Sequence, residues 1–375
     1  MTRNLLQKIR LKHLMCGAIL TLLVIVVLWM RVTIENVYVD IERTVNPIRP
    51  PNFSKKMISD VLFIGYVMGG TVFPAEVLGM RPGHFYVHEP LHKIAKYQYF
   101  KPGYVCNMMN MNCNATQVAD REALGIVNAV YQCDNTRYRG HLRMWQLRKI
   151  VGDQLTWQRS MQVHCGGGQH KDCRGKLLSQ CSHSMSRVVS TPRLSLSLAS
   201  RLLTQLPNLK IVHVYRDPRA IMYSNIHAKW SFPDGEMDTA KSLCLKMNAD
   251  LAESVHIKNV FPNKFLTVFH EQLATAPEKT MQKIFDFVGY EMDENESVIK
   301  KFKTLFYENS TLKPRTWRTH ASWSFVKVIN EACAGLYRSL GYPDLADRYE
   351  VSNNSIPLLI STTGNNIPAL NDTVK

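Results

Sequence analysis

The sequence is short of acidic residues. Its 375 residues include 30 aspartates and glutamates against 46 lysines and arginines, which gives a formal net charge of +16. It also has no internal repeat and no convincing Asp-x-Asp motif, which argues against a metal-dependent glycosyltransferase. The excess of positive charge predicts an anionic partner, which could be nucleic acid, an acidic membrane, a phosphorylated cofactor or an acidic glycan. The length suits one large domain with additional segments.

An uncharged hydrophobic run of 17 residues, Leu14 to Met30, is at the short end of what spans a bilayer. Basic residues precede this run, so the tail before it should stay cytosolic and the chain after it should be lumenal. A cleaved signal peptide is the alternative, but no small-x-small cleavage site follows the run. The predicted order is a cytosolic tail (1–13), a signal-anchor transmembrane helix (14–31), a lumenal stem (32–56), a catalytic domain (57–349) and a disordered tail (350–375).

Glycosylation sequons and cysteines agree with a lumenal body. The N-x-S/T sequons are at Asn52, Asn114, Asn295, Asn309, Asn353 and Asn371. Eight cysteines follow the hydrophobic run: Cys106, Cys113, Cys133, Cys165, Cys173, Cys181, Cys244 and Cys333. An even number in an oxidising compartment predicts disulfides, but eight cysteines allow many pairings and none is assigned. A lumenal body argues against nucleic acid as the anionic partner.

The pattern of apolar runs predicts an α/β domain with a mostly parallel sheet. Buried strands are expected at 61–67, 187–189, 210–215 and 265–270. Helices are expected from about Val72, over the leucine-rich stretch that ends at Pro207, and after Asp217-Pro218, where Asp caps the helix and Pro begins it. A last helix is expected from a capping box at Thr275 and Glu278 to Gly289.

A glycine-rich segment, Gly65 to Thr71 (GYVMGGT), lies between the first predicted strand and a helix. Glycines let backbone N–H groups converge on a phosphate, and the helix N-terminus adds a favourable field. The alternative is a tight strand-to-helix turn without a ligand. No lysine stands between Gly70 and Thr71, and no convincing Mg²⁺-binding aspartate is present, which argues against a nucleoside triphosphate-dependent kinase.

A second segment, Tyr215 to Ser224, places Arg216 at a strand end and Ser224 about two turns into the following helix. A guanidinium fork and a hydroxyl in that arrangement suit a phosphate monoester. The structural alternative is an Arg216 that only pairs with Asp217.

A third segment, Phe85 to His92 (FYVHEPLH), brings a carboxylate and two imidazoles close to the glycine-rich loop in sequence. Transfer of a sulfuryl group to an alcohol needs a base for the hydroxyl proton and positive charge near the leaving phosphate. The alternative is a capping Glu89 with two surface histidines.

One cluster resembles a zinc site: Cys165, His170, Cys173, Cys181 and His183. In an oxidising lumen we interpret it as disulfide cysteines with solvated histidines, so no metal is predicted.

Together the three segments resemble the Golgi carbohydrate sulfotransferases, which place sulfate on the 6-hydroxyl of galactose, N-acetylgalactosamine or N-acetylglucosamine. In that family a loop of the type Arg-Ser-Gly-Ser-Ser-Phe precedes Phe-Tyr-x-x-Glu-Pro-Leu by a fixed interval, which Met68–Phe73 and Phe85–Leu91 keep. The family's Val-Arg-Asp-Pro-Arg-Ala followed by Ser matches Tyr215–Ser224. Shorter echoes are Thr191-Pro192-Arg193, Phe269–Leu273, Trp317-Arg318, and Cys333 before Gly341-Tyr342.

The resemblance implies a three-layer sulfotransferase fold, 3′-phosphoadenosine-5′-phosphosulfate (PAPS) as co-substrate, and a type II protein of the Golgi membrane. It implies a glycan or glycosaminoglycan acceptor, held by basic residues outside the donor site. Glu89 would be the general base. Donor-binding residues would be Met68, Gly69, Gly70, Thr71, Val72, Phe73, Arg193, Arg216 and Ser224.

The chain departs from the family pattern at the donor loop. Met68 stands where the family has a basic residue, Gly69 and Val72 replace serines, and Ser190 stands where many relatives have lysine. Two cations expected near the leaving phosphate are therefore missing, and loss of one such contact costs about 10²–10³ in rate. Lys55, Lys56, Lys93 and Arg187 are the candidates to replace them. The alternative function is a lumenal member that binds donor or glycan with little or no turnover.

Overall fold

A computed structural model describes the chain over residues 58–79, 81, 83–110, 112–134, 146–151, 154–159, 173–228, 235–290 and 314–360. The chain divides into two units, Met1–Lys56 and Met57–Lys375. The predicted cytosolic tail, anchor and stem all lie outside the described residues. Among the helices that are described, none is both long and apolar enough to cross a membrane.

The second unit is built on a seven-stranded sheet with the order β10-β9-β1-β8-β2-β6-β7. Its strands are β1 (Asp60–Ile64), β2 (His84–His88), β6 (Gln146–Val151), β7 (Gln154–Arg159), β8 (Ser186–Thr191), β9 (Leu209–Tyr215) and β10 (Phe265–Phe269). The strands from β10 to β2 run parallel, whereas β6 and β7 are antiparallel. The carboxyl ends of the parallel strands therefore meet at one edge, which is where ligands bind in open α/β sheets.

A second, smaller antiparallel sheet has the order β3-β4-β5. Its strands are β3 (Gln98–Lys101), β4 (Tyr104–Asn107) and β5 (Cys113–Ala115). The described helices are α2 (Val72–Gly79), α3 (Ala119–Tyr131), α5 (Cys173–His183), α6 (Leu196–Ala199), α7 (Leu202–Gln205), α8 (Pro218–His227), α9 (Glu236–Val260), α10 (His270–Thr275), α11 (Pro277–Val288), α13 (Thr316–His320), α14 (Trp323–Ala332), α15 (Leu336–Leu340) and α16 (Arg348–Ser352).

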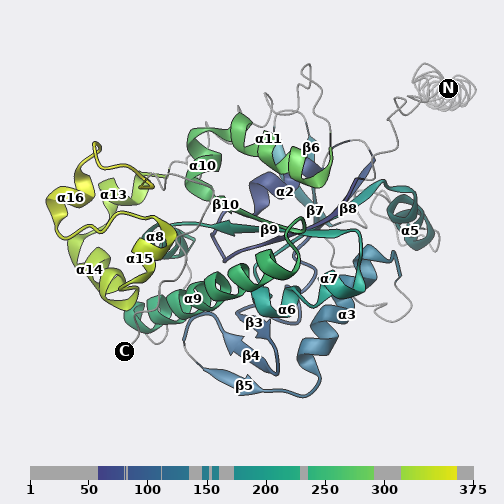
Figure 1. The fold of residues 1–375 in the computed structure, drawn as a ribbon, viewed down its shortest axis with the longest axis horizontal. Coiled ribbons are helices and arrows are strands. Elements are labelled where there is room, and N and C mark those ends of the chain that lie inside the picture. Colours follow the sequence, from purple (N-terminus) through teal and green to yellow (C-terminus); the bar gives the residue numbers. More distant parts are fainter. Residues whose placement is uncertain are drawn as a thin grey trace, which may run out of the picture. The chain divides into compact units, whose positions relative to one another are not determined.

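Helices cover both faces of the main sheet, which makes three layers (Figure 1). Successive residues of a strand point to opposite faces. Leu62 and Ile64 of β1 pack into a core shared with α3, α6 and α7. Val61 and Phe63 pack into a separate core shared with α2 and α11. Because all of β1 is buried, its continuous apolar run is explained by burial on both faces.

The predicted strands and the mostly parallel sheet are confirmed, except that β1 ends at Ile64 and not at Val67. Asp217 caps α8 by accepting a hydrogen bond from the Arg219 N–H, with Pro218 at the first turn, as the sequence indicated. The predicted C-terminus of α11 is also confirmed, because Gly289 adopts the left-handed conformation there (φ 85°).

Three expectations differ from the structure. The leucine-rich stretch forms two short helices, α6 and α7, instead of one. The predicted capping box at Thr275 is wrong. Thr275 is the last residue of α10 and its hydroxyl donates to Glu271 O in the same helix, while α11 begins at Pro277. The chain is also structured beyond residue 350, since Ile356 O accepts a bond from Arg318 Nη1 at 2.9 Å. The rest of the predicted disordered tail, residues 361–375, lies outside the described part.

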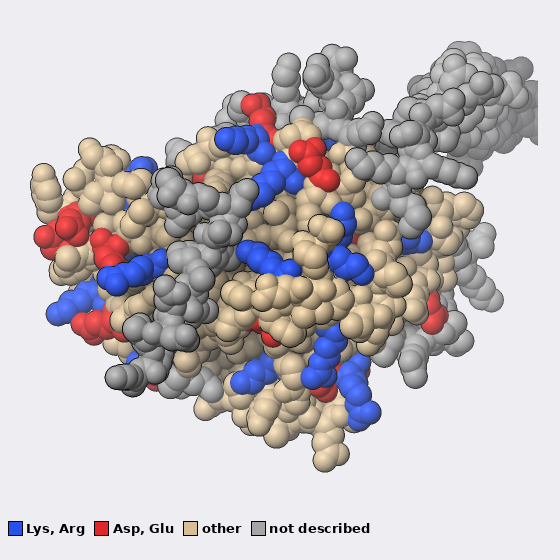
Figure 2. Space-filling view, in the orientation of Figure 1, with Lys and Arg blue, Asp and Glu red and all other residues tan. Residues whose placement is uncertain are grey.

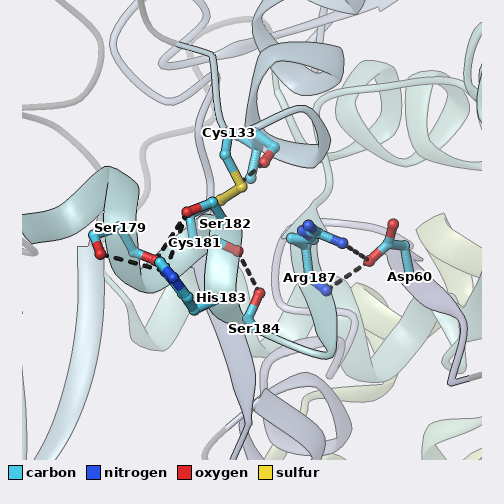
Figure 3. The surroundings of a disulfide bond; sticks show 9 residues. Asp60, Cys133, Ser179, Cys181, Ser182, His183, Ser184 and Arg187 are labelled. Atoms are coloured by element: carbon cyan, nitrogen blue, oxygen red, sulfur yellow. Dashed lines mark hydrogen bonds and ion pairs between the residues drawn. A yellow bond between two sulfur atoms is a disulfide. The ribbon is translucent and has the colours of Figure 1, made fainter. Parts of the chain in front are cut away.

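Three disulfides join described cysteines: Cys106–Cys113, Cys133–Cys181 and Cys244–Cys333. Figure 3 shows Cys181 bonded to Cys133 with His183 turned to the Ser179 carbonyl, 2.7 Å from its Nδ1. The sulfur of Cys181 is therefore committed to a disulfide, as the sequence analysis preferred over a zinc site. Cys165, His170 and the side chain of Cys173 lie outside the described residues. Among described side chains, no group of three or more His, Cys, Asp and Glu could hold a metal ion.

Candidate active site

The glycine-rich loop forms a tight turn between β1 and α2. The Gly69 N–H donates to Tyr66 O at 2.8 Å, and a Cβ at Gly69 would lie 2.7 Å from that oxygen. Gly70 has φ +87°, and a Cβ there would lie 2.2 Å from His270 Nδ1. Both positions therefore require glycine, for close approach and, at Gly70, for the left-handed backbone. The loop presents backbone N–H groups ahead of α2, which is the arrangement that holds anions.

Met68 is the one non-glycine residue of this loop with a left-handed backbone, at φ 60°. Its side chain is partly exposed, and its carbonyl oxygen accepts a hydrogen bond from Arg216 Nη1 at 2.6 Å. Thr71 and Phe73 are buried at the start of α2, and Phe73 belongs to the core on that side of the sheet.

The contact between Arg216 and Met68 joins two sequence segments that are 148 residues apart. Arg216 stands at the end of β9, next to β1 in the sheet, so the parallel register brings its buried guanidinium to the loop. Its Nε has no hydrogen-bond partner among the described residues, although it is buried. A buried donor without a partner is costly, and an anion in the loop would satisfy it.

Asp217 is not held by a hydrogen bond from Arg216. Its carboxylate accepts from Nε and Nη2 of Arg219, both at 2.9 Å. The structural alternative for Arg216, a simple pair with its neighbour, is therefore not the arrangement found. Ser224 lies half-buried on α8, two turns after the cap, as the sequence predicted.

A buried carboxylate, Glu271, connects two of the shorter segments that resemble the family, Phe269–Leu273 and Gly341-Tyr342. Glu271 accepts a hydrogen bond from the Asp217 N–H at 3.0 Å and from the Tyr342 hydroxyl at 3.0 Å. Burial raises the pKa of Glu271 to about 7. Its neighbour His270, which contacts the loop, is also buried, and burial together with the charge of Arg216 lowers the pKa of His270 well below its usual range.

Glu89 lies at the end of β2, in an unusual left-handed backbone conformation (φ 43°). Its Oε2 accepts bonds from Arg193 Nε and Nη2 at 2.9 and 2.7 Å, and His92 Nδ1 lies 3.1 Å away. Burial by itself raises the pKa of Glu89. The hydrogen bond from His92 and the charge of Arg193 outweigh burial, so the pKa falls to about 2. Glu89 is thus the acidic partner in an ion pair, not a helix cap.

His88, beside Glu89, belongs to a hydrogen-bonded cluster that sequence reasoning missed. His88 Nδ1 lies 2.9 Å from Ser190 Oγ and 3.2 Å from the Tyr86 hydroxyl. Tyr86 and Ser190 are themselves 3.0 Å apart. The register of β2 against β8 pairs His88 with Ser190, and that pairing could have been inferred only with the strand alignment in hand. A hydrogen-bonded polar cluster therefore surrounds Ser190, the position at which the resembled family has lysine.

The four basic residues considered as replacements for the missing cations are accounted for only in part. Arg187 pairs with Asp60 at the amino ends of β8 and β1, the opposite edge of the sheet from the loop, so it cannot serve. Lys93 is exposed in the turn that follows β2. The other two candidates, the lysines at positions 55 and 56, lie outside the described residues. On the face drawn in Figure 2, lysine and arginine side chains are dispersed with acidic groups between them, without one continuous basic band.

A second network missed from sequence lies beneath the loop. Asp250, on α9, accepts from Lys246 Nζ at 2.7 Å, from the Leu196 N–H at 2.7 Å and from the Tyr66 hydroxyl at 3.2 Å. Lys246 Nζ also lies 3.5 Å from Gly65 O. The one signal in the sequence was the i, i+4 spacing of Lys246 and Asp250 on a helix. This network fixes the loop from behind.

Comparisons with known proteins identify a family model and relatives that this chain resembles. The family model described as "Sulfotransferase domain" matches residues 59–327. The chain is 22% identical over 345 residues to carbohydrate sulfotransferase 3 of Tetronarce californica, covering 80% of this chain and 76% of that protein. It is 20% identical over 360 residues to carbohydrate sulfotransferase 1 of Rattus norvegicus, covering 82% and 84%.

Solved structures with a similar arrangement include the sulfotransferase domain of an olefin synthase from Synechococcus, at 16% identity and a TM-score of 0.39, over 76% of this chain and 95% of that one. A mouse sulfotransferase complexed with PAP is similar at 13% identity and a TM-score of 0.38, over 74% and 88%.

Proposed function

This chain belongs to the sulfotransferase domain family, and on that basis we propose that it transfers a sulfuryl group from PAPS to a sugar hydroxyl on a glycan or proteoglycan. The acceptor position we favour is the 6-hydroxyl of galactose, N-acetylgalactosamine or N-acetylglucosamine. The relatives named carbohydrate sulfotransferases support a carbohydrate acceptor.

The observation that carries the proposal is the hydrogen bond from Arg216 to the Met68 carbonyl. It brings the segment suited to a 3′-phosphate against the loop suited to a 5′-phosphosulfate. PAPS carries both groups on one ribose, so a single donor would contact both segments. The buried Arg216 Nε fits this ligand, because a phosphate oxygen would supply its missing acceptor.

Gly69, Gly70 and Thr71 would bind the 5′-phosphosulfate through their backbone N–H groups, with Met68, Val72 and Phe73 completing the loop. Arg216 and Ser224 would bind the 3′-phosphate. In the reaction the acceptor oxygen forms a bond to sulfur while the bond from sulfur to the phosphate oxygen breaks. A protein group takes the hydroxyl proton. The loop would hold the phosphate in line for this displacement.

Glu89 remains our candidate for that proton acceptor, and its ion pair with Arg193 would determine how strong a base it is. Because the pKa of Glu89 is lowered to about 2, its carboxylate is ionised throughout the physiological range. The same ion pair makes it a weak base. The rate should therefore stay flat as the pH falls to about 5. A rate that falls on protonation nearer neutrality would instead indicate that a histidine takes the hydroxyl proton. His88, beside Glu89, would then be the candidate.

We also propose that the protein is a single-pass type II glycoprotein with its catalytic domain in the Golgi lumen. The hydrophobic run at 14–30 and the sequons support this. Three disulfides among the described residues support an oxidising compartment. Asn114, one of the sequons, is exposed on β5, where a glycan can be attached.

The test is sulfate transfer by the full-length chain in detergent, with radiolabelled PAPS and a panel of chondroitin, keratan and N-acetylglucosamine-terminated acceptors. We expect labelled product with at least one acceptor and a loss of about 10² or more in rate for Glu89→Gln. Absence of product with every acceptor, from a folded protein that binds 3′,5′-adenosine bisphosphate (PAP), would contradict the proposed transfer.

One observation favours a second function, that of a binding protein with weak or no turnover. The loop from Gly65 to Phe73 contains no lysine or arginine, and the nearby Ser190 has a hydroxyl, which lies 2.9 Å from His88 Nδ1, in place of an ammonium. Donor binding would need the backbone N–H groups of the loop and Arg216, whereas turnover would need a positive side-chain charge next to the leaving phosphate. PAP binding without transfer would identify this second function.

A further inference from the structure

His270 is a buried histidine at the edge of the sheet where the two proposed donor segments meet. It is the first residue of α10 and follows directly after β10. β10 pairs in parallel with β9, with Phe269 opposite Tyr215. His270 and Arg216 are therefore the next residues after two neighbouring strands, and both lie at the carboxyl edge of the sheet, where ligands bind in this kind of fold.

The imidazole of His270 lies against the glycine-rich loop. A Cβ at Gly70 would lie 2.2 Å from Nδ1, 3.0 Å from Cγ and 3.1 Å from Cε1 of this ring. The edge of the ring that carries Nδ1 thus fills the space that a side chain at position 70 would need. Gly70 is one of the three residues whose N–H groups we propose to hold the 5′-phosphosulfate, so the ring borders the part of the loop assigned to that group.

Neither ring nitrogen of His270 has a hydrogen-bond partner among the described residues, although the side chain is only 1% exposed. A neutral imidazole has one N–H donor, and leaving such a donor buried without an acceptor is costly. Glu271, the next residue, does not supply the acceptor, because its carboxylate receives the Asp217 N–H and the Tyr342 hydroxyl. An apolar side chain would fill the same space without this cost, so the unpaired nitrogens indicate a ligand that brings an acceptor.

We propose that His270 is a further donor-binding residue, whose imidazole N–H donates to an oxygen of the 5′-phosphosulfate of PAPS. The inference rests on the proposed sulfate transfer and adds to its donor site a residue that the sequence analysis did not identify. Arg216 would bind the 3′-phosphate and His270 the 5′ group, from the ends of neighbouring strands. As the bond from sulfur to the phosphate oxygen breaks, negative charge grows on the leaving phosphate, so this hydrogen bond would be strongest in the transition state.

The donor that His270 contributes is a neutral one. Burial and, after it, the positive charge of Arg216 lower the pKa of His270 well below its usual range. The imidazole would therefore add a hydrogen bond to the loop but no positive charge. This agrees with a loop that holds its anion by N–H groups instead of by a cation.

The experiment measures nucleotide affinity by calorimetry on the full-length protein in detergent. The nucleotides are PAP, adenosine 3′-phosphate and adenosine 5′-phosphate, which carry both phosphates or only one of them. His270→Asn and His270→Leu are a matched pair, because the two side chains are similar in size and only asparagine keeps an N–H donor near the position of Nδ1. His183→Leu, at an exposed position on α5, is the control and should change none of the affinities.

His270→Leu should weaken PAP by about ten- to a hundredfold, the range for one hydrogen bond to a charged group, and His270→Asn should weaken it much less. The same loss should appear with adenosine 5′-phosphate and be absent with adenosine 3′-phosphate. The thermal midpoint of the free protein should not fall in His270→Leu, because the imidazole has no partner to lose there. With PAPS, kcat/KM for sulfate transfer should fall at least as far as PAP affinity.

Three results would each overturn the inference. They are unchanged PAP affinity in His270→Leu, an equal loss in His270→Asn, and equal losses with the 3′- and 5′-phosphates, which would show that His270 only supports the shape of the site. The proposed function fails separately. If the nucleotides bind with the expected pattern but no acceptor is sulfated, His270 stands as a nucleotide-binding residue and the transfer proposal fails.

Discussion

The two segments proposed to hold the donor differ in how their charge is organised. The segment after β9 concentrates charge: Arg216 donates to the loop, Arg219 pairs with Asp217, and Glu271 accepts a hydrogen bond from the Asp217 N–H. The loop after β1 has glycines and backbone N–H groups but no side-chain cation. The first segment can bind a phosphate strongly, whereas the second can only cradle one. If the two segments bind the donor as we propose, donor affinity should depend mainly on Arg216 and turnover on the loop, so mutation should separate the two.

The largest effect should come from the charged segment. Arg216→Ala removes the guanidinium that joins both segments and should reduce sulfate transfer by about 10²–10³. Steady-state kinetics with saturating acceptor measures this loss. Arg201→Ala is the control, because the Arg201 side chain is half exposed and lies 4.0 Å from Asp120 of α3, which is not one of the proposed site residues. Equal activity of the two variants would contradict the proposed role of Arg216 in binding the donor.

A smaller effect, of opposite sign, should come from restoring charge to the loop. Met68→Lys places an ammonium where the resembled family has a basic residue. Met68 already has a left-handed backbone (φ 60°), so the substitution adds no backbone strain. We expect kcat to rise by about ten- to a hundredfold, with PAP affinity changed much less. Met68→Leu should leave both unchanged. If Met68→Lys gives no gain, another cation already serves the leaving phosphate.

Gly70 of the loop and Gly103, in the turn between β3 and β4, are a matched pair that separates close contact from backbone strain. Gly70 and Gly103 have similar φ angles, +87° and +75°, but only a Cβ at Gly70 would meet another atom, His270 Nδ1. Gly103→Ala should therefore cost about 1–2 kcal/mol of stability. Gly70→Ala should cost more and should also weaken PAP binding, which thermal shift with and without PAP would measure. Equal shifts in both variants would contradict the account of the loop.

The last prediction concerns the pH dependence of stability. The pKa of Glu271 rises from 4.5 to about 7 on folding. Its contribution to stability is therefore complete below the lower value and is lost as the pH rises through the higher one. Glu271→Gln should reduce the fall in unfolding free energy between about pH 5 and pH 8, measured by denaturant titration. The exposed Glu278→Gln serves as control and should leave that fall as it is.

Local signals in the sequence were enough for the framework of the fold. Val61 to Ile64 form a buried strand because every side chain is apolar, and Asp217-Pro218 fixes the start of α8 by capping chemistry alone. The proposed donor segments follow from these elements, since parallel strands bring their carboxyl ends together. The bond from Arg216 to Met68 is the consequence of that register.

Long-range contacts could not be predicted from the same signals. The Thr275 capping box failed because its hydroxyl found a partner in α10, one helix earlier. The ion pair of Glu89 with Arg193 spans 104 residues and depends on how β2 and β8 align, so the low pKa of Glu89 was invisible. A cavity that Asn225 lines is formed by side chains from separate elements, and no local sequence pattern in any of them signals it.

The central claim is that the loop and the Arg216 segment hold one nucleotide with two phosphate groups. Calorimetry with the full-length protein, comparing PAP with adenosine 5′-phosphate, tests this most directly. We predict that PAP binds about a hundredfold or more tightly than the nucleotide lacking the 3′-phosphate, and that Arg216→Ala removes most of this difference. Equal affinity for the two nucleotides, or a difference that survives in Arg216→Ala, would contradict the account.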